Sequence, residues 1–455
     1  MSENETGTEP KTESHDPAVP AAYAAFMRQG WGERELDLPV AEVAAPAAKR
    51  RQRLADAFPG ERLVLPAGTY KVRAYDTDYR FRPDTAHTYF SGNQTSDAVL
   101  VIDDGESVLY ARPRSSRDTD EFFRDRQYGE LWAGRRPSLK EMSDSLGLEV
   151  RHIDALPSFD DDRKTRRLTT DTELARVASE LRLIKDDWEV GQLQEACDIT
   201  TLGFEDVVRE WDRVLEYGER WVEGTFFRRA RAMGNDIGYD SIVGGGKHAT
   251  TLHWIDNTGP MTPGELVLLD MGVENTSLYT ADVTRTLPVN GRFTDLQREL
   301  YDLVHAAQQA GIDAIRPGAT FRVGHNAAMD VLAHGLEDLG LLPVSAEEAL
   351  DPESRVYARW TLHGTSHMLG MDVHDCGQAA PEAYAEGTLA EGMVLTVEPG
   401  LYFQEDDLLV PEELRGIGIR IEDDLLVTAE GSTNLSAALP RTSSDVEEWM
   451  GRLRG

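Results

Sequence analysis

The chain has 455 residues, which is longer than one domain usually is, so two domains are expected. Hydrophobic residues make up 40% of it, enough for a sizeable core. Its 81 acidic and 47 basic residues give a net charge of −34, which argues against a nucleic-acid or anionic-membrane partner because phosphates would be repelled. No run approaches the roughly 18 apolar residues of a membrane span, and the N-terminus lacks the basic and then apolar order of a secretory signal, so we expect a cytoplasmic protein. Cys197 and Cys376 are too few for a disulfide framework and are interpreted as unpaired thiols.

The first half of the chain divides into a tail and a domain. Residues 1–22 are polar, acidic and proline-containing, which predicts a disordered tail. Residues 23–178 combine helical stretches with short apolar runs. The run at 98–113 predicts two strands joined by a turn at Asp103-Asp104-Gly105. This pattern is typical of an α/β domain.

The second half begins after a polar stretch. Residues 156–172 are interpreted as a linker, and an amphipathic helix is expected from Leu181. Residues 179–455 then alternate helices, expected at 295–315 and 320–338, with strands such as ELVLLDMGVE and GMVLTVEP. We expect a second domain here.

Four acidic residues of this second domain lie on apolar stretches. They are Asp270 in GELVLLDMG, Asp282 in SLYTADVTRTLPV, Glu398 in GMVLTVEPG and Glu422 in GIGIRIEDD. An ionised carboxylate is expensive to bury without a partner, so four such residues indicate a bound cation. Asp423 and Asp424, which follow directly, are interpreted as a solvated strand end.

Histidines gather in the same domain. HGTSHMLGMDVH contains His363, His367 and His374, and His248 and His253 lie upstream. Neutral imidazole is the commonest metal ligand and also acts as a hydrogen-bond donor or proton relay. Taken singly, a strand-end Asp is more often a turn cap, and a core His more often makes a structural hydrogen bond. The residues alone therefore leave a metal site and ordinary structural roles equally open.

The motifs themselves resemble the pita-bread metallopeptidases, specifically the aminopeptidase P (Xaa-Pro aminopeptidase) family. They are LLDMG, TADVTRTLPVNGRFT, HGTSHMLGMDVHD, LTVEPGLYF and GIGIRIEDD, in that order, preceded by the lead-in GYDSIVGGGKHATTLHW. The resemblance covers nearly the whole chain after the tail. It implies an α+β fold with a C-terminal pita-bread (creatinase/aminopeptidase) catalytic domain at 179–455 and an α/β creatinase-type N-terminal domain at 23–178.

The resemblance also implies site residues. The metal ligands that it implies are Asp270, Asp282, His367, Glu398 and Glu422. The residues that it places around the metals or on the substrate are His253, His363, His374 and Arg420, with Tyr402 supporting the same pocket. Asp270 and Asp282 are twelve residues apart, one more than is common in the family, so the turn between them must absorb an extra residue.

The N-terminal match lies in RAYDTDYRFRPDTAHTYFSGN and ELWAGRR. It implies that Asp76 and Trp132 contact substrate in an active site, either that of their own subunit or that of a neighbouring one. A surface turn residue and a packing residue are the alternatives. The family resemblance further suggests a homodimer or homotetramer.

The implied chemistry is hydrolysis with two divalent ions. Four carboxylates and one imidazole form a hard, oxygen-dominated set that suits Mn²⁺, with Zn²⁺ and Co²⁺ as alternatives. A hydroxide bridging ions roughly 3.5–4 Å apart would attack the carbonyl before proline, with Glu398 as general base. The ions and one or two of the site histidines would stabilise the oxyanion. The expected function is removal of the N-terminal residue from peptides with proline in the second position.

The sequence also allows other functions. A prolidase, which cleaves only Xaa-Pro dipeptides, shares the fold and metals, but HGTSH with Ser366 and GIGIRIEDD look more like aminopeptidase P. A methionine aminopeptidase would not need the N-terminal domain. A metal-free creatinase-like amidinohydrolase and a non-enzymatic binding protein of this fold both predict missing ligands, whereas all five are present.

Overall fold

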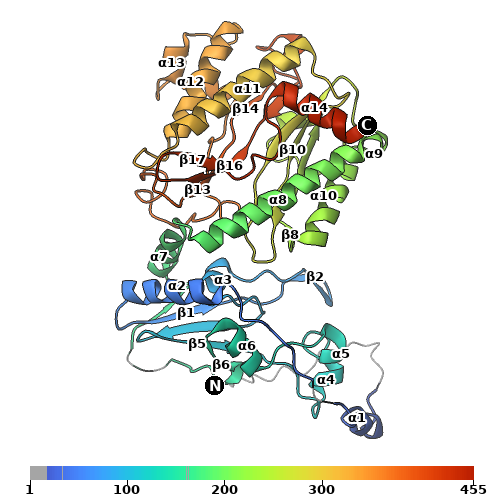
Figure 1. The fold of residues 1–455 in the computed structure, drawn as a ribbon, viewed down its shortest axis with the longest axis vertical. Coiled ribbons are helices and arrows are strands. Elements are labelled where there is room, and N and C mark those ends of the chain that lie inside the picture. The colour runs from blue at the N-terminus through green and yellow to red at the C-terminus, as the bar shows by residue number, and fades with distance from the viewer. Residues whose placement is uncertain (1–17, 33, 160, 162) are drawn as a thin grey trace. The chain divides into compact units, whose positions relative to one another are not determined.

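The computed structural model describes residues 18–32, 34–159, 161 and 163–455, which fold into two compact units, Met1–Val177 and Ala178–Gly455 (Figure 1). The disordered tail expected over 1–22 lies outside the described residues as far as position 17. Its last residues begin helix α1 (Ala21–Met27). Within the described ranges, no helix is long and apolar enough to cross a membrane.

The N-terminal unit is built on a five-stranded sheet in the order β6-β5-β4-β1-β7. Its strands are β1 (Arg62–Pro66), β4 (Val99–Asp103), β5 (Glu106–Ala111), β6 (Glu149–His152) and β7 (Thr165–Arg167). β4 and β5 form the hairpin expected at 98–113, with Asp104 and Gly105 of the turn at positive φ. β7 lies in the segment interpreted as a linker. Because its sequence, TRR, has no apolar run, its parallel pairing with β1 left no pattern to read.

Helices and a small hairpin complete this unit. They are α2 (Ala44–Ala57), β2 (Val72–Ala74), β3 (Thr77–Asp78), α3 (Thr85–Ser91), α4 (Glu121–Arg124), α5 (Glu130–Ala133) and α6 (Leu139–Leu146). α6 shows how local sequence sets the ends of a helix. Ser138 and Glu141 form a capping box at its start, and Gly147 in the left-handed region ends it.

The second unit begins in α7 (Thr172–Arg182), which contains the boundary between the units. The helix expected from Leu181 is broken at 183–186, because Asp186 caps a new helix, α8 (Asp187–Arg209), through a capping box with Glu189. The remaining helices are α9 (Trp211–Tyr217), α10 (Glu219–Met233), α11 (Asp295–Ala314), α12 (Val323–Asp338), α13 (Ala346–Leu350) and α14 (Ser443–Arg454).

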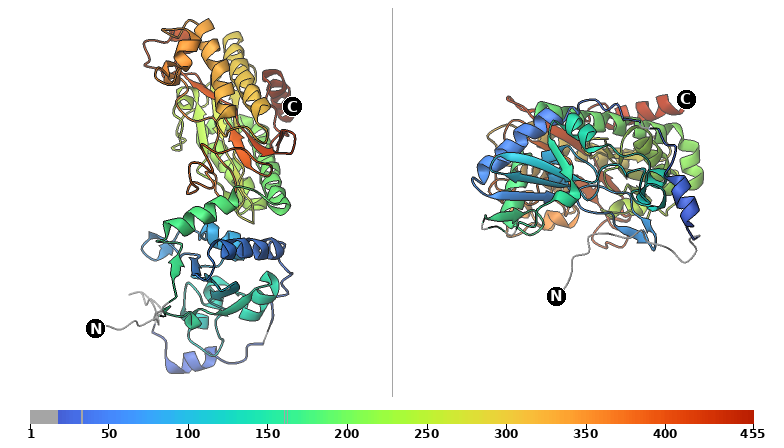
Figure 2. Two further views of the ribbon diagram at one scale, coloured as in Figure 1. Left: turned by 90° about the vertical axis from the view of Figure 1, so that its left-hand side faces the viewer. Right: turned by 90° about the horizontal axis from the view of Figure 1, so that it is seen from below.

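Short sheets lie between these helices. Their strands are β8 (Asp236–Ile237), β9 (Ile242–Gly245), β10 (Leu266–Asp270), β11 (Val273–Glu274), β12 (Thr284–Pro288), β13 (Val394–Val397), β14 (Gly400–Tyr402), β15 (Gly418–Arg420), β16 (Asp423–Val427) and β17 (Ser432–Asn434). They pair as β12-β10-β9, β11-β8, β13-β16-β17 and β14-β15. α8 and α10 pack together, as do α11 and α12, which lie side by side in Figure 1 and Figure 2.

A separate cluster holds residues of β13 and β16, and one larger core joins the helix pairs to strands β9, β10, β12, β14 and β15. Trp211, Phe226, Tyr301 and Phe403 are almost completely buried in it, and each such side chain contributes roughly 1.5–3 kcal/mol of hydrophobic stabilisation. The strand ends are therefore held by a rigid frame. This frame positions the acidic and histidine side chains of the site.

Candidate active site and metal centre

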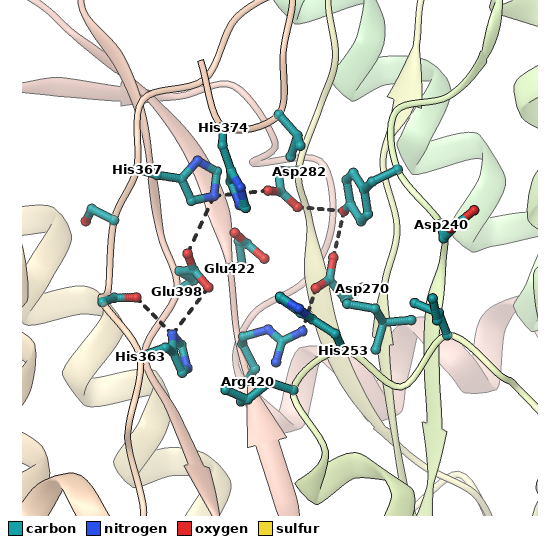
Figure 3. Close-up of a pocket in the computed structure, with 17 residues that line it drawn as sticks. Asp240, His253, Asp270, Asp282, His363, His367, His374, Glu398, Arg420 and Glu422 are labelled. Atoms are coloured by element: carbon teal, nitrogen blue, oxygen red, sulfur yellow. Dashed lines mark hydrogen bonds and ion pairs between the residues drawn. The ribbon is translucent and has the colours of Figure 1, made fainter. Parts of the chain in front are cut away.

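A pocket of about 530 Å³ opens in the second unit, lined by the ends of strands and the loops that follow them (Figure 3). Its charged and histidine lining residues are Asp240, His253, Asp270, Asp282, His363, His367, His374, Glu398, Arg420 and Glu422. Ile242, Leu252, Ile255 and Val373 add apolar surface. The pocket thus combines a dense acidic centre with an apolar wall.

Asp270 and Asp282 are brought together by antiparallel pairing. Asp270 is the last residue of β10, and Asp282 lies two residues before β12, the strand that pairs with β10. The Tyr239 hydroxyl lies 2.6 Å from an oxygen of each carboxylate. Burial raises the pKa of Tyr239 well above its usual value, so the hydroxyl stays protonated and its one hydrogen is shared between these two oxygens. The lead-in motif GYDSIVGGG contains Tyr239, but nothing in its local pattern singles it out.

The turn between the two aspartates is held by a buried asparagine. Asn275 is fully buried, and its side-chain oxygen accepts the backbone N–H of Tyr279 at 3.0 Å. Leu278 takes a positive φ of 69° within this turn. The turn is thereby closed into a compact loop, and Asp270 and Asp282 both reach the Tyr239 hydroxyl.

The other half of the site supplies His367, Glu398 and Glu422. His367 Nε2 lies 3.2 Å from Asp282 Oδ2 and 3.6 Å from Glu398 Oε1. One ligand atom each of Asp282, His367 and Glu422 lies within 4.8 Å of the others, a spacing that could hold a metal ion. Thr284 donates to Glu422 Oε2 at 2.6 Å and orients that carboxylate.

The buried carboxylates of this centre repel one another and would bind cations. Burial, together with neighbouring carboxylates, raises the pKa of Glu398 to about 7 and raises the pKa values of Asp270 and Glu422. Although burial alone would lower it, the pKa of His367 rises to about 9 through its bond to Asp282 and the charge of Glu398. Divalent cations would relieve this repulsion, and the oxygen-rich donor set fits hard ions.

A chain of hydrogen bonds runs from Arg420 to His363. Arg420 forms an ion pair with Asp270, and its Nη1 donates to the Tyr402 hydroxyl at 3.0 Å. Tyr402 lies 2.7 Å from His363 Nε2, and His363 Nδ1 lies 2.8 Å from the Gly364 carbonyl oxygen. Burial lowers the pKa of His363 to about 4, so the ring is neutral and its one proton sits on Nδ1, facing the carbonyl. His363 Nε2 therefore accepts from Tyr402.

His253 and His374 face the pocket from its two loops (Figure 3). The His374 ring packs edge-on against His367, with ring centroids 4.4 Å apart, and burial lowers its pKa. His253 lies in an exposed stretch between β9 and β10. Both imidazoles reach the space that a substrate would occupy.

The loop that carries His374 is tied to the start of the second unit. Asp375 is buried and accepts from Arg182 Nε at 3.1 Å and Lys185 Nζ at 3.3 Å. Its backbone N–H donates to the Met368 carbonyl at 2.9 Å. Burial favours the neutral acid, but the two cations hold the pKa of Asp375 below its usual range, so this is a buried ionic cluster.

The interpretation of Asp423 and Asp424 as a solvated strand end is wrong. Both are completely buried, because β16 is the central strand of its sheet. Asp423 pairs with Arg285 at 2.7 Å, and Asp424 accepts the backbone N–H of Asp282 at 3.0 Å and the Cys197 thiol at 3.3 Å. These acids therefore brace the start of β16, directly after Glu422, and the segment that carries Asp282.

Asp76 and Trp132 belong to the N-terminal unit, whereas the pocket residues all come from the second unit. Both lie near Arg126, which is 3.8 Å from an Asp76 oxygen and stacks over the Trp132 ring at 5.3 Å. The Trp132 indole N–H donates to the Phe123 carbonyl at 2.7 Å, while 56% of the side chain remains exposed. An exposed tryptophan so held is available to contact another molecule.

Comparison with known proteins identifies relatives along nearly the whole chain. Residues 191–429 match metallopeptidase family M24, and residues 47–167 match the aminopeptidase P N-terminal domain. The chain is 51% identical to Xaa-Pro aminopeptidase 1 of Streptomyces coelicolor over 96% of its own length and 94% of that protein's. It is 33% identical to Xaa-Pro aminopeptidase of Escherichia coli, over 88% of this chain and 96% of that protein.

Solved structures agree in fold. Aminopeptidase P from E. coli with the inhibitor Pro-Leu superposes with a TM-score of 0.80 at 29% identity, covering 92% of this chain and 100% of that one. Aminopeptidase PepP of Pseudomonas aeruginosa gives a TM-score of 0.80 at 28% identity, covering 91% and 99%. The α+β fold expected from the motifs, a pita-bread domain preceded by an N-terminal domain of the aminopeptidase P type, is confirmed.

Proposed function

Because this chain belongs to metallopeptidase family M24 and, within it, to the aminopeptidase P family, we propose that it removes the N-terminal residue from peptides whose second residue is proline. It is a metal-dependent hydrolase. The observation that carries the proposal is the convergence of Asp282, His367 and Glu422 within 4.8 Å at the base of a pocket with an apolar wall.

We assign the ions to five side chains: Asp270, Asp282, His367, Glu398 and Glu422. Their burial and mutual repulsion support the assignment, and their oxygen-rich chemistry supports two Mn²⁺ ions. Bound there, divalent ions would polarise the scissile carbonyl and activate water at neutral pH. Replacing Asp270 and Asp282 together by alanine tests the assignment, since unchanged metal content would exclude it.

Protein side chains then handle protons and orientation. Glu398 is the proposed general base, because its carboxylate lies in the pocket among the proposed metal ligands, where it could take a proton from water that the ions activate. The bond before proline has no N–H, and its leaving group is a secondary amine that must be protonated. Glu398 would return the proton taken from the attacking water to the proline nitrogen as the C–N bond breaks.

Of the three histidines expected on the substrate, the structure favours two as donors to the developing oxyanion. The proton of neutral His363 faces a backbone carbonyl, and its other nitrogen accepts from Tyr402. It therefore has no N–H to offer and orients Tyr402 and Arg420 instead. His253 and His374 carry the proposed donor role.

A peptide panel tests the function. Metal-free enzyme supplemented with Mn²⁺ should cleave an Xaa-Pro-Yaa tripeptide, leave Xaa-Ala-Yaa intact and act weakly on an Xaa-Pro dipeptide. Preference for the dipeptide would instead identify a prolidase, the second candidate. Repeating the assay with Zn²⁺ and Co²⁺ tests the choice of metal.

Three further proposals concern the setting of the enzyme. A homodimer or homotetramer, checked by light scattering, would allow Asp76 and Trp132 to reach a neighbouring subunit's site, and the exposed indole supports that role. Replacing Trp132 by alanine should then raise KM without altering metal content. A cytoplasmic location is supported by the two unpaired thiols, Cys197 and Cys376.

A further inference from the structure

Glu219, a residue outside the pocket, controls the segment that carries His253. It is the first residue of α10, and its side chain is completely buried. We infer that Glu219 is a positioning residue: its carboxylate fixes both ends of segment 245–259 and thereby aims His253 at the substrate. This inference rests on the proposed function in so far as His253 acts on the substrate.

Each carboxylate oxygen of Glu219 binds a backbone N–H at one end of the segment and a side chain within it. Oε1 accepts the Gly245 N–H at 2.8 Å and lies 2.8 Å from His248 Nδ1. Oε2 accepts the Gly259 N–H at 2.6 Å and the Trp254 indole N–H at 2.9 Å. One side chain therefore holds four groups spread over fifteen residues of chain, and bonds to a buried carboxylate are the strong kind.

The backbone around this carboxylate is closely fitted. The Glu219 N–H donates to the Gly259 carbonyl at 3.0 Å, so the two residues are bonded in both directions. A Cβ on Gly259 would lie 2.6 Å from Glu219 Oε1, and one on Gly218, which has a φ of +77°, would lie 2.3 Å from the Gly259 carbonyl oxygen. No side chain fits at either glycine, and the carboxylate has a single position relative to the segment.

His253 needs such support because its own surroundings are open. The residue is exposed, as is Ile255, whose backbone N–H donates to the His253 carbonyl at 3.1 Å. Trp254, between them, turns inward, stacks on the His248 ring at 3.9 Å between centroids and binds Glu219. The direction of His253 is therefore set by its inward-facing neighbour, which depends on Glu219.

Glu219→Gln tests this role without changing side-chain size. In either orientation the new amide presents its NH₂ to one backbone donor, Gly245 or Gly259, which loses its acceptor. We expect kcat to fall about 10- to 100-fold with KM little changed, because misplacement of a catalytic group costs this much. Hydrogen exchange should accelerate in peptides covering 245–259, and bound metal should stay at the wild-type level. Glu223→Gln, one turn further along α10, is the matched control and should change none of these quantities.

A double-mutant cycle separates positioning from general support. If Glu219 acts through His253, then Glu219→Gln should lower kcat no more than about twofold in a His253→Ala background. Trp254→Phe, which keeps the stacking on His248 and removes one donor, should shift exchange and kcat in the same direction by less, and it carries the test if Glu219→Gln does not fold.

Full additivity in the cycle, or faster exchange of the segment with unchanged kcat, would overturn the inference. A wild-type enzyme that cleaves no Xaa-Pro-Yaa peptide would overturn the proposed function instead. The exchange comparison would still decide whether Glu219 holds the segment.

Discussion

Removing the Tyr239 hydroxyl should weaken metal binding without disturbing the fold. The hydroxyl lies 2.6 Å from oxygens of Asp270 and Asp282, two of the proposed ligands. A buried hydrogen bond to a charged group contributes about 1.5–3 kcal/mol, so Tyr239→Phe should weaken metal affinity by roughly 10- to 150-fold. This range is of the same order as the roughly 10- to 100-fold loss of metal affinity seen when residues that orient metal ligands are replaced in other proteins.

Calorimetric titration of metal-free protein with Mn²⁺ measures this change directly. Tyr301→Phe provides the matched control, because Tyr301 is also a buried tyrosine but donates to the Arg441 carbonyl at 3.0 Å, away from the pocket. It should lose about 1 kcal/mol of folding stability and keep its metal affinity. Equal metal affinity in Tyr239→Phe and wild type would refute the reasoning, since the two aspartates would then need no shared donor.

Three more changes have defined outcomes. Glu398→Gln should lower kcat at least 100-fold for Xaa-Pro-Yaa peptides, and near-normal turnover with metal still bound would exclude Glu398 as the general base. Asp407→Asn should cost about 1 kcal/mol in thermal unfolding at pH 7. The bonds to Arg359 lower the pKa of Asp407 from 3.8 to about 2, so they stabilise the fold fully above pH 3.8. The difference in stability between wild type and Asp407→Asn should therefore shrink as pH falls from 3.8 toward 2, and a difference that stays constant over this range would contradict the reasoning. Asp375→Asn leaves two buried cations short of a partner and should cost roughly 3–5 kcal/mol in denaturant unfolding, whereas a neutral effect would show that the cluster is hydrated.

The family and fold could be predicted because the motifs are local and ordered. LLDMG, HGTSHMLGMDVHD and GIGIRIEDD each place an acid or histidine at a strand end or in a loop. The structure brings Asp282, His367 and Glu422 together although they lie far apart in the chain. Residue patterns alone left a metal site undecided, because a single strand-end acid is common in proteins without metals.

The residues that hold the site could not be predicted from local pattern. Glu219 follows Gly218 at a helix start, where an acidic residue usually faces solvent, and only the fold shows four donors around it. Asp423 is matched by Arg285, which lies 138 residues earlier, so its sequence neighbours gave no sign of burial. Pairing across such separations depends on the whole fold.

The ionic cluster at Asp375 also sets the smallest fragment that can form this site. The match to family M24 begins at residue 191, yet both cations of the cluster, Arg182 and Lys185, come before it. A protein trimmed to residue 191 would bury the Asp375 carboxylate without them, next to His374, which lines the pocket. The functional border of the catalytic unit therefore lies upstream of Arg182, within α7, because the buried Asp375 carboxylate in the His374 loop needs both cations.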